Sequence, residues 1–161
     1  MNKQEFQFSF QVYASAEELN KEDALLLGQA RTITTKAYAP YSNFHVGAVA
    51  KLSTGEIVAG TNQENASYPV GICAERSLLA TVGTLYPNVA IDTMAISYDN
   101  QNGQSDYPIS PCGMCRQSLV EYEHRTNQPI RLILAGMIGK VIIVEKASQL
   151  LPLSFTGSDL K

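Results

Sequence analysis

The cysteines of this 161-residue chain constrain it more than any other feature. Cys73 begins the segment Cys-Ala-Glu-Arg, and Cys112 and Cys115 stand two residues apart in Pro-Cys-Gly-Met-Cys-Arg; the sequence contains no further cysteine. Three thiolates can occupy three corners of a tetrahedral zinc site, and a catalytic zinc keeps the fourth corner for water or substrate. Glu75, two residues after the first cysteine, is then a candidate proton carrier.

The same cysteines have other interpretations. A cysteine pair of this spacing can be a redox couple or half of a structural zinc site, and a structural site would need His45 or His124 as its fourth ligand. His124 lies about 13 Å from Cys115 along a helix, which is too far. His45 precedes a strand-like run, where an exposed histidine is favoured. The odd cysteine count and the lack of a signal peptide favour a reducing cytoplasm over disulfides.

Composition limits the classes of partner. At 45% hydrophobic, residues 1–161 are expected to form a single domain with a sizeable core. No apolar run approaches the length of a membrane span. A net charge of -3 without a basic stretch disfavours nucleic-acid binding. A small-molecule ligand is the remaining expectation.

Strand-like and helical patterns alternate along the chain, which predicts the α/β class. Strands are expected at about residues 5–13, 46–52, 57–60, 91–97, 130–135 and 141–144, and helices at 22–37, 74–81 (stopping at Gly83) and 112–123. Both cysteine segments therefore fall at helix starts, where unpaired N–H groups and the helix dipole stabilise thiolates. Arg76 and Arg116 are candidates to donate to the sulfurs and reduce their charge; the alternative, an ordinary surface arginine, has as much support for Arg116 and less for Arg76.

Cys-Ala-Glu at 73–75, followed by Pro-Cys-Gly-Met-Cys at 111–115, resembles the signature of the zinc-dependent nucleoside and nucleobase deaminases. The resemblance narrows to the small cytidine deaminases, because three further segments are similar to that family. They are Pro-Tyr-Ser-Asn-Phe-His-Val-Gly-Ala at 40–48, Asn-Gln-Glu-Asn-Ala-Ser-Tyr at 62–68 and Leu-Pro-Leu-Ser-Phe at 151–155. Together the matches cover about residues 20–160 in family order.

The resemblance implies a fold, an activity and an assembly. The fold is a three-layer α/β/α sandwich with a mixed sheet of about five strands. The activity is zinc-dependent hydrolytic deamination of cytidine and deoxycytidine to uridine and deoxyuridine plus ammonia, in pyrimidine salvage. The assembly is a homotetramer with shared active sites and one Zn²⁺ per subunit.

The resemblance also implies roles for individual residues. Glu75 serves as base and then acid, and Cys73, Cys112 and Cys115 hold the zinc. The expected substrate contacts are the ribose hydroxyls for Asn62 and Glu64, the pyrimidine face for Phe44, the base 2-carbonyl for the Ala74 N–H, and closure of the site by Phe155 from a neighbouring subunit.

Three features depart from the family pattern. The first is the N-terminal strand, and the second is a pair of substitutions: His45 stands where the family often has proline, and Pro69 where it often has glycine. The third is an extended polar loop at 99–107. Three alternatives stay open. The chain could deaminate free cytosine, a nucleotide or a polynucleotide, and Glu64 argues against the last two. It could be a catalytically silent zinc domain, which retention of Glu75 argues against. It could also be a redox protein using Cys112 and Cys115.

Overall fold

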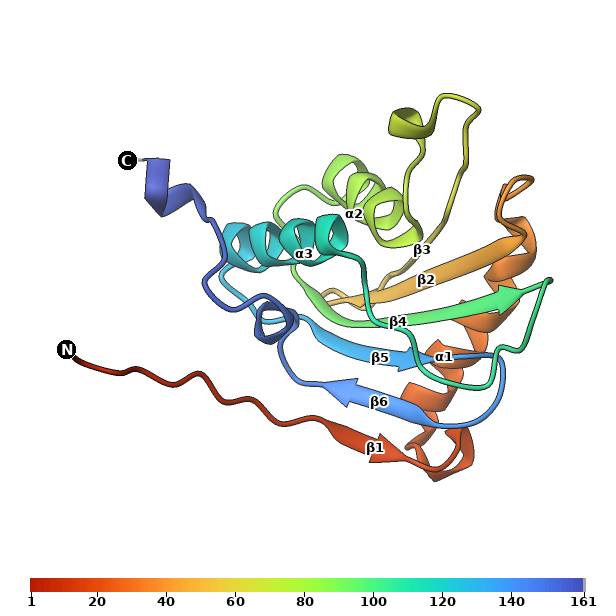
Figure 1. The fold of residues 1–161 in the computed structure, drawn as a ribbon, viewed down its shortest axis with the longest axis horizontal. Helices are drawn as coiled ribbons and strands as arrows, with labels where there is room; N and C mark the ends of the chain where they lie inside the picture. Colours follow the sequence, from red (N-terminus) through yellow and green to blue (C-terminus); the bar gives the residue numbers. More distant parts are fainter. Residues whose placement is uncertain (161) are drawn as a thin grey trace.

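A six-stranded mixed sheet forms the centre of the computed structural model, which describes residues 1–160 (Figure 1). The strand order is β1-β6-β5-β4-β2-β3, and β4 and β5 pair in parallel while the other neighbours are antiparallel. The strands are β1 (Gln11–Tyr13), β2 (Phe44–Leu52), β3 (Ile57–Thr61), β4 (Ile91–Asn100), β5 (Arg131–Ala135) and β6 (Val141–Val144).

Helices cover both faces of this sheet. One face carries α1 (Lys21–Ile33), and the other carries α2 (Ala74–Leu85) and α3 (Gly113–Thr126) (Figure 1). The predicted three-layer α/β/α sandwich is confirmed, with one strand more than the expected five. The additional strand is β1, which adds to the free edge of β6. Among residues 1–160, no helix combines the length and apolar character that crossing a bilayer requires.

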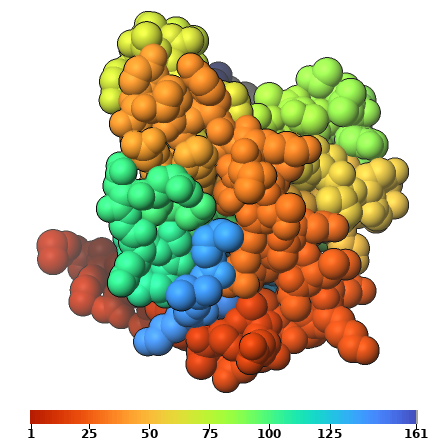
Figure 2. All heavy atoms as spheres, turned by 90° about the vertical axis from the view of Figure 1, so that its right-hand side faces the viewer, coloured from red at the N-terminus to blue at the C-terminus, as the bar shows by residue number. Residues whose placement is uncertain are grey.

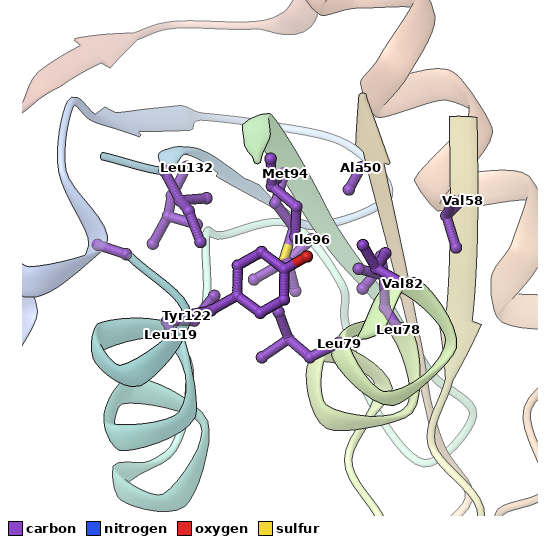
Figure 3. Close-up of a cluster of buried hydrophobic side chains, with 14 of the residues drawn as sticks. Ala50, Val58, Leu78, Leu79, Val82, Met94, Ile96, Leu119, Tyr122 and Leu132 are labelled. Carbon is purple, nitrogen blue, oxygen red and sulfur yellow. The ribbon is translucent and has the colours of Figure 1, made fainter. Parts of the chain in front are cut away.

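The two layers of helices pack on alternate side chains of the same strands. On β4, Ala95 faces α1 and joins a core with Leu27 and Ile133. Its neighbours Met94 and Ile96 face the opposite side, where they pack with side chains of α2 and α3 (Figure 3). Because the middle of β4 is buried on both faces, its residues 94–98 are buried one after another instead of alternating with exposed positions.

The expected N-terminal strand forms over only part of its range. Residues 11–13 pair with β6, and residues 1–10 belong to no strand. The reason is the length of the partner: β6 contains only four residues, and its Ile143 is already paired with Gln11. Phe6, Phe8 and Phe10 alternate with polar residues, a pattern typical of a half-buried strand. Their side chains are nevertheless exposed, and each ring lies near the next, with centroids 6.4 and 6.0 Å apart.

Three predicted helix ends are also wrong, and the first is that of α3, which continues to Thr126 instead of ending at 123. α1 ends at Ile33 and continues as a single 3₁₀ turn over Thr34–Lys36, so it is shorter than expected. α2 passes through Gly83 to Leu85, because a glycine weakens a helix without ending it and the neighbouring Val82 is buried in the core. The strand β4 is also longer than the expected 91–97: it extends to Asn100, which pairs with Phe44 at the start of β2.

A buried carboxylate fixes α3 to the sheet. Glu123 lies in the last turns of α3, and its Oε1 accepts hydrogen bonds from the backbone N–H groups of Ile130 (2.7 Å) and Ala147 (2.9 Å). Its Oε2 accepts one from Ser148 at 3.1 Å. One side chain thereby joins the helix to the chain before β5 and to the chain after β6.

We expect Glu123→Gln to destabilise the protein by about 2–3 kcal/mol, because the amide removes the charge and places an NH₂ group opposite a backbone donor. Glu121→Gln is the matched control, since Glu121 is exposed on the same helix and should change stability by less than about 0.5 kcal/mol. Urea unfolding of the two variants measures the difference. Equal stabilities would show that the Glu123 hydrogen bonds contribute little.

Candidate active site

The three cysteines come together where two helices begin. Cys73 is the N-cap of α2 and Cys112 is the N-cap of α3, while Cys115 lies one turn into α3 and is buried. The Sγ atoms of Cys73 and Cys112 are 3.8 Å apart, those of Cys112 and Cys115 are 3.5 Å apart, and all three lie within 4.8 Å of one another. The predicted ligand set is therefore assembled from two segments that are distant in sequence.

The spacing of the sulfurs fits a tetrahedral metal. Zinc binds thiolate sulfur at about 2.3 Å, so two sulfurs on one tetrahedral zinc lie about 3.8 Å apart. All three cysteines are free, at separations well beyond a disulfide bond. Within residues 1–160, neither His45 nor His124 joins this cluster of possible ligands. The chain therefore offers three donors and leaves a fourth position for a non-protein ligand, as a catalytic zinc site does.

The cluster already favours negative charge on one of its sulfurs. Hydrogen bonding to Cys115, opposed by burial and the charge of Glu75 and aided by the charge of Arg76, lowers the pKa of Cys73 to about 6. The same hydrogen bond, together with burial, raises the pKa of Cys115. Arg116 makes two hydrogen bonds to backbone carbonyls: its Nε donates to the oxygen of Pro111 (2.8 Å) and its Nη1 to that of Leu150 (3.1 Å). These bonds fix the entry into α3.

Glu75 lies beside the thiols but does not belong to the cluster of possible metal ligands. It occupies the first turn of α2, is buried, and lines the same pocket as Cys73 and Cys112. Burial raises the pKa of Glu75 above its ordinary value. Because the carboxyl group is held out of water but open to the pocket, it is placed to exchange protons with a bound molecule rather than with solvent.

The pocket next to the thiols has a volume of about 500 Å³, which suits a small organic molecule. Its lining includes the predicted substrate-binding residues Phe44, Asn62, Glu64 and Ala74. Sequence reasoning missed Val46, Ile109 and Ser110, which also line it. Their signals were indirect: Val46 shares a strand face with Phe44, and Ile109 and Ser110 directly precede the Pro111-Cys112 motif.

The Asn62 side chain holds one wall of this pocket in place. Its Oδ1 accepts from the backbone N–H of Val46 (2.7 Å), and its Nδ2 donates to the carbonyl oxygen of Phe44 (2.9 Å). The amide therefore pairs with the beginning of β2 as a neighbouring strand would. One lone pair and one N–H of the amide remain for a ligand.

Glu64 is oriented in a similar way. Its Oε2 accepts from the backbone N–H groups of Tyr41 (2.9 Å) and Ser42 (3.3 Å), which leaves Oε1 available. Desolvation raises the pKa of Glu64, whereas the hydrogen bonds from Ser42 and Tyr41 lower it, and the net shift is downward. The carboxylate is thus an anionic acceptor with a fixed direction.

Phe155 is the one predicted substrate contact that lies elsewhere. It belongs to the C-terminal segment beyond α3 (Figure 1), where its carbonyl oxygen accepts from Gln117 Nε2 at 2.8 Å. Its side chain is 58% exposed and is not part of the pocket lining of its own chain.

In comparisons with known proteins, a family model and individual relatives agree on one family. Residues 20–128 match the family described as the cytidine and deoxycytidylate deaminase zinc-binding region. A cytidine deaminase of Halalkalibacterium halodurans is 34% identical over 84% of this chain and 96% of its own. One from Mycoplasma genitalium is 37% identical over 64% of this chain and 75% of its own.

Solved structures show the same likeness. A crystal structure of cytidine deaminase from Burkholderia pseudomallei matches with a TM-score of 0.70 at 33% identity, over 85% of this chain and all of the other. The crystal structure of cytidine deaminase from Mycobacterium tuberculosis matches with a TM-score of 0.62 at 28% identity, over 81% and 94% of the two chains.

The cysteine geometry predicts one zinc per chain, and we expect Cys112→Ala to lose it because two thiolates cannot fill the site. Met114→Ala is the control, since Met114 lies between the two cysteines of α3 but is exposed. Elemental analysis of the dialysed proteins measures the difference. Full zinc occupancy in Cys112→Ala would point to another set of ligands.

Proposed function

The chain belongs to the cytidine and deoxycytidylate deaminase zinc-binding family, and from this we propose that it converts cytidine and deoxycytidine to uridine and deoxyuridine. The reaction adds one water at C4 of the pyrimidine and releases ammonia, as pyrimidine salvage requires. One observation carries the proposal: a buried glutamate, Glu75, adjoins three clustered thiols in a pocket that also contains a phenylalanine ring and two oriented polar side chains.

The residues at the wall of the pocket have binding roles in this proposal. Phe44 packs against the face of the base, because a flat ring buries a flat ligand at low conformational cost. The N–H of Ala74 binds the 2-carbonyl of the base. Ala74 is the first residue of α2, so its N–H has no partner within the helix.

Asn62 and Glu64 bind the ribose hydroxyls through the atoms that the fold leaves free. These are the second N–H of the Asn62 amide and Oε1 of Glu64. An anionic carboxylate accepts a hydrogen bond from a hydroxyl but repels a phosphate at the same position. This supports a free nucleoside as substrate over a nucleotide or a polynucleotide, and so does the net charge of -3.

Glu75 carries the protons of the reaction. It accepts a proton from the attacking water and delivers it to N3 of the pyrimidine, then accepts the second proton from the hydroxyl newly formed at C4 and delivers it to the departing amine, which leaves as ammonia. Cys73, Cys112 and Cys115 are the residues that would hold zinc, and the chemistry that a bound zinc supplies is activation of water near neutral pH. Arg76 assists by compensating thiolate charge at Cys73.

We also propose that the active protein is a cytoplasmic homotetramer with shared sites. The support for sharing is the position of Phe155, which is largely exposed and lies outside the pocket of its own chain. In a symmetric assembly it can close the pocket of a neighbouring copy. Three free cysteines favour a reducing compartment.

The activity is tested by the ultraviolet absorbance change as cytidine becomes uridine. We expect conversion by the zinc-loaded protein, none by the metal-stripped protein, and recovery after zinc is returned. Glu75→Gln should keep zinc and bind uridine while losing turnover by about three or more orders of magnitude, because the proton route is removed and the ligands stay.

Glu121→Gln, an exposed carboxylate on α3, is the control and should retain wild-type turnover. Normal turnover by Glu75→Gln would contradict the assigned role. No conversion of cytidine by wild-type protein with full zinc would overturn the proposed activity, and activity on free cytosine or cytidine monophosphate would redirect it.

Shared sites predict complementation between two damaged chains. Glu75→Gln and Phe155→Ala homo-oligomers should both be impaired, the first in proton transfer and the second in closing the pocket. In a coexpressed mixture, an intact Glu75 can meet an intact Phe155 supplied by the other variant, so activity should exceed the average of the two. Light scattering should give the mass of four chains. Activity that equals the average would place Phe155 outside any shared site.

A further inference from the structure

The ring of Phe44 has an aromatic partner inside the protein. Tyr98 of β4 stacks on it with ring centroids 4.8 Å apart and planes only 14° from parallel. In the β2–β4 ladder, Tyr98 stands directly opposite Val46, and Phe44 lies two residues along the same face of β2. Phe44 and Val46 line the pocket, whereas Tyr98 is fully buried behind them.

A third ring joins this stack to the zinc-ligand loop. Tyr107 lies edge-on to Tyr98, with centroids 5.8 Å apart and planes at 62°. Tyr107 belongs to the polar loop that leads from the end of β4 to Cys112, and Ile109 and Ser110 of this loop line the pocket. The three rings therefore connect the two sides of the pocket.

This loop is fixed against neighbouring segments on both sides. Asn102 Nδ2 donates to the carbonyl oxygen of Ser42 at 3.1 Å, and the backbone N–H of Ile138 donates to that of Ser105 at 3.2 Å. Figure 2 shows the loop, in green, lying against the chain before β2 in orange and the β5–β6 connection in blue. A Cβ at Gly136 would overlap the carbonyl oxygen of Ser105, so the loop sits directly on that connection.

We propose that Tyr98 is a positioning residue for nucleoside binding: its ring sets the plane of Phe44, and Phe44 in turn presents a fixed face to the pyrimidine. This inference rests on the proposed function. Phe44 is only half-buried and its Cβ-to-ring torsion is soft. A flat surface on one side restrains that torsion, and an aliphatic side chain of similar size would not.

The Tyr98 hydroxyl indicates that volume alone does not explain this residue. Its oxygen is buried and makes no hydrogen bond within the described part of the chain, which is unfavourable for a polar group. The aliphatic neighbours on the same strand face, Met94 and Ile96, show that the core here accepts apolar side chains. The feature that distinguishes Tyr98 is its ring, which makes the parallel contact with Phe44.

The test compares Tyr98→Leu with Tyr98→Phe in the zinc-loaded protein. We expect Tyr98→Leu to raise the KM for cytidine and the Kd for uridine by about three- to tenfold, the range that an aromatic pair supplies, with kcat within about twofold and full zinc. Tyr98→Phe keeps the stack and should restore wild-type KM. Ile96→Val is the control for a disturbed core, because it trims a buried side chain on the same strand face, and it should leave KM unchanged.

A double-mutant cycle with Phe44→Leu separates positioning from general loosening. Once Phe44 is absent, Tyr98→Leu should add no further loss of uridine affinity. Wild-type KM in Tyr98→Leu, an equal loss in Tyr98→Phe, or full additivity with Phe44→Leu would each overturn the proposal. A wild-type protein that neither converts cytidine nor binds uridine would instead overturn the proposed function.

Discussion

The site depends on the direction of two strands. β2 is antiparallel to both β3 and β4, so β3 and β4 run the same way through the sheet. A helix that follows either strand and packs back across the sheet must begin at the edge where that strand ends. α2 follows β3 and α3 follows β4, and they cover the same face (Figure 1). Their N-termini therefore meet at one edge, and Cys73, Cys112 and Cys115 meet with them.

Close approach of α2 to the sheet completes this arrangement. A Cβ at Gly60 of β3 would lie 2.5 Å from both the carbonyl oxygen of Ala74 and the backbone nitrogen of Leu78. Any larger residue at Gly60 would push away the turn that carries Glu75. At the other helix, Arg116 fixes the entry to α3 and Glu123 fixes its far end. The metal donors thus lie at the starts of two helices that are also held in place by contacts away from the thiols.

The sequence predicted the features that depend on local patterns, and it missed those that depend on pairing between distant segments. The cysteines and Glu75 were found because their spacing along the chain is itself the signal, and most strands because apolar runs are local. The end of β4 and the limits of β1 depend on how far a partner strand extends, which no local pattern records. Tyr98 was missed for the same reason: the expected strand ended at residue 97, and only pairing with β2 extends β4 far enough to place Tyr98 behind Phe44.

Apart from Ala74 of α2, the residues that we propose bind the ligand lie on different elements from the reactive groups. The thiols and Glu75 belong to α2 and α3, whereas Phe44 and Val46 belong to β2, Asn62 and Glu64 to the loop after β3, and Ile109 to the loop before α3. Asn62 joins its loop to β2 by two hydrogen bonds, and Tyr98 supports β2 from within the sheet. Strand pairing therefore holds these proposed binding residues in place, and helix packing holds the metal donors in place. If these residues bind the ligand as we propose, a change of side chain among them is expected to alter which ligand fits without moving the cysteines, so that substrate preference can change separately from the chemistry at the thiols.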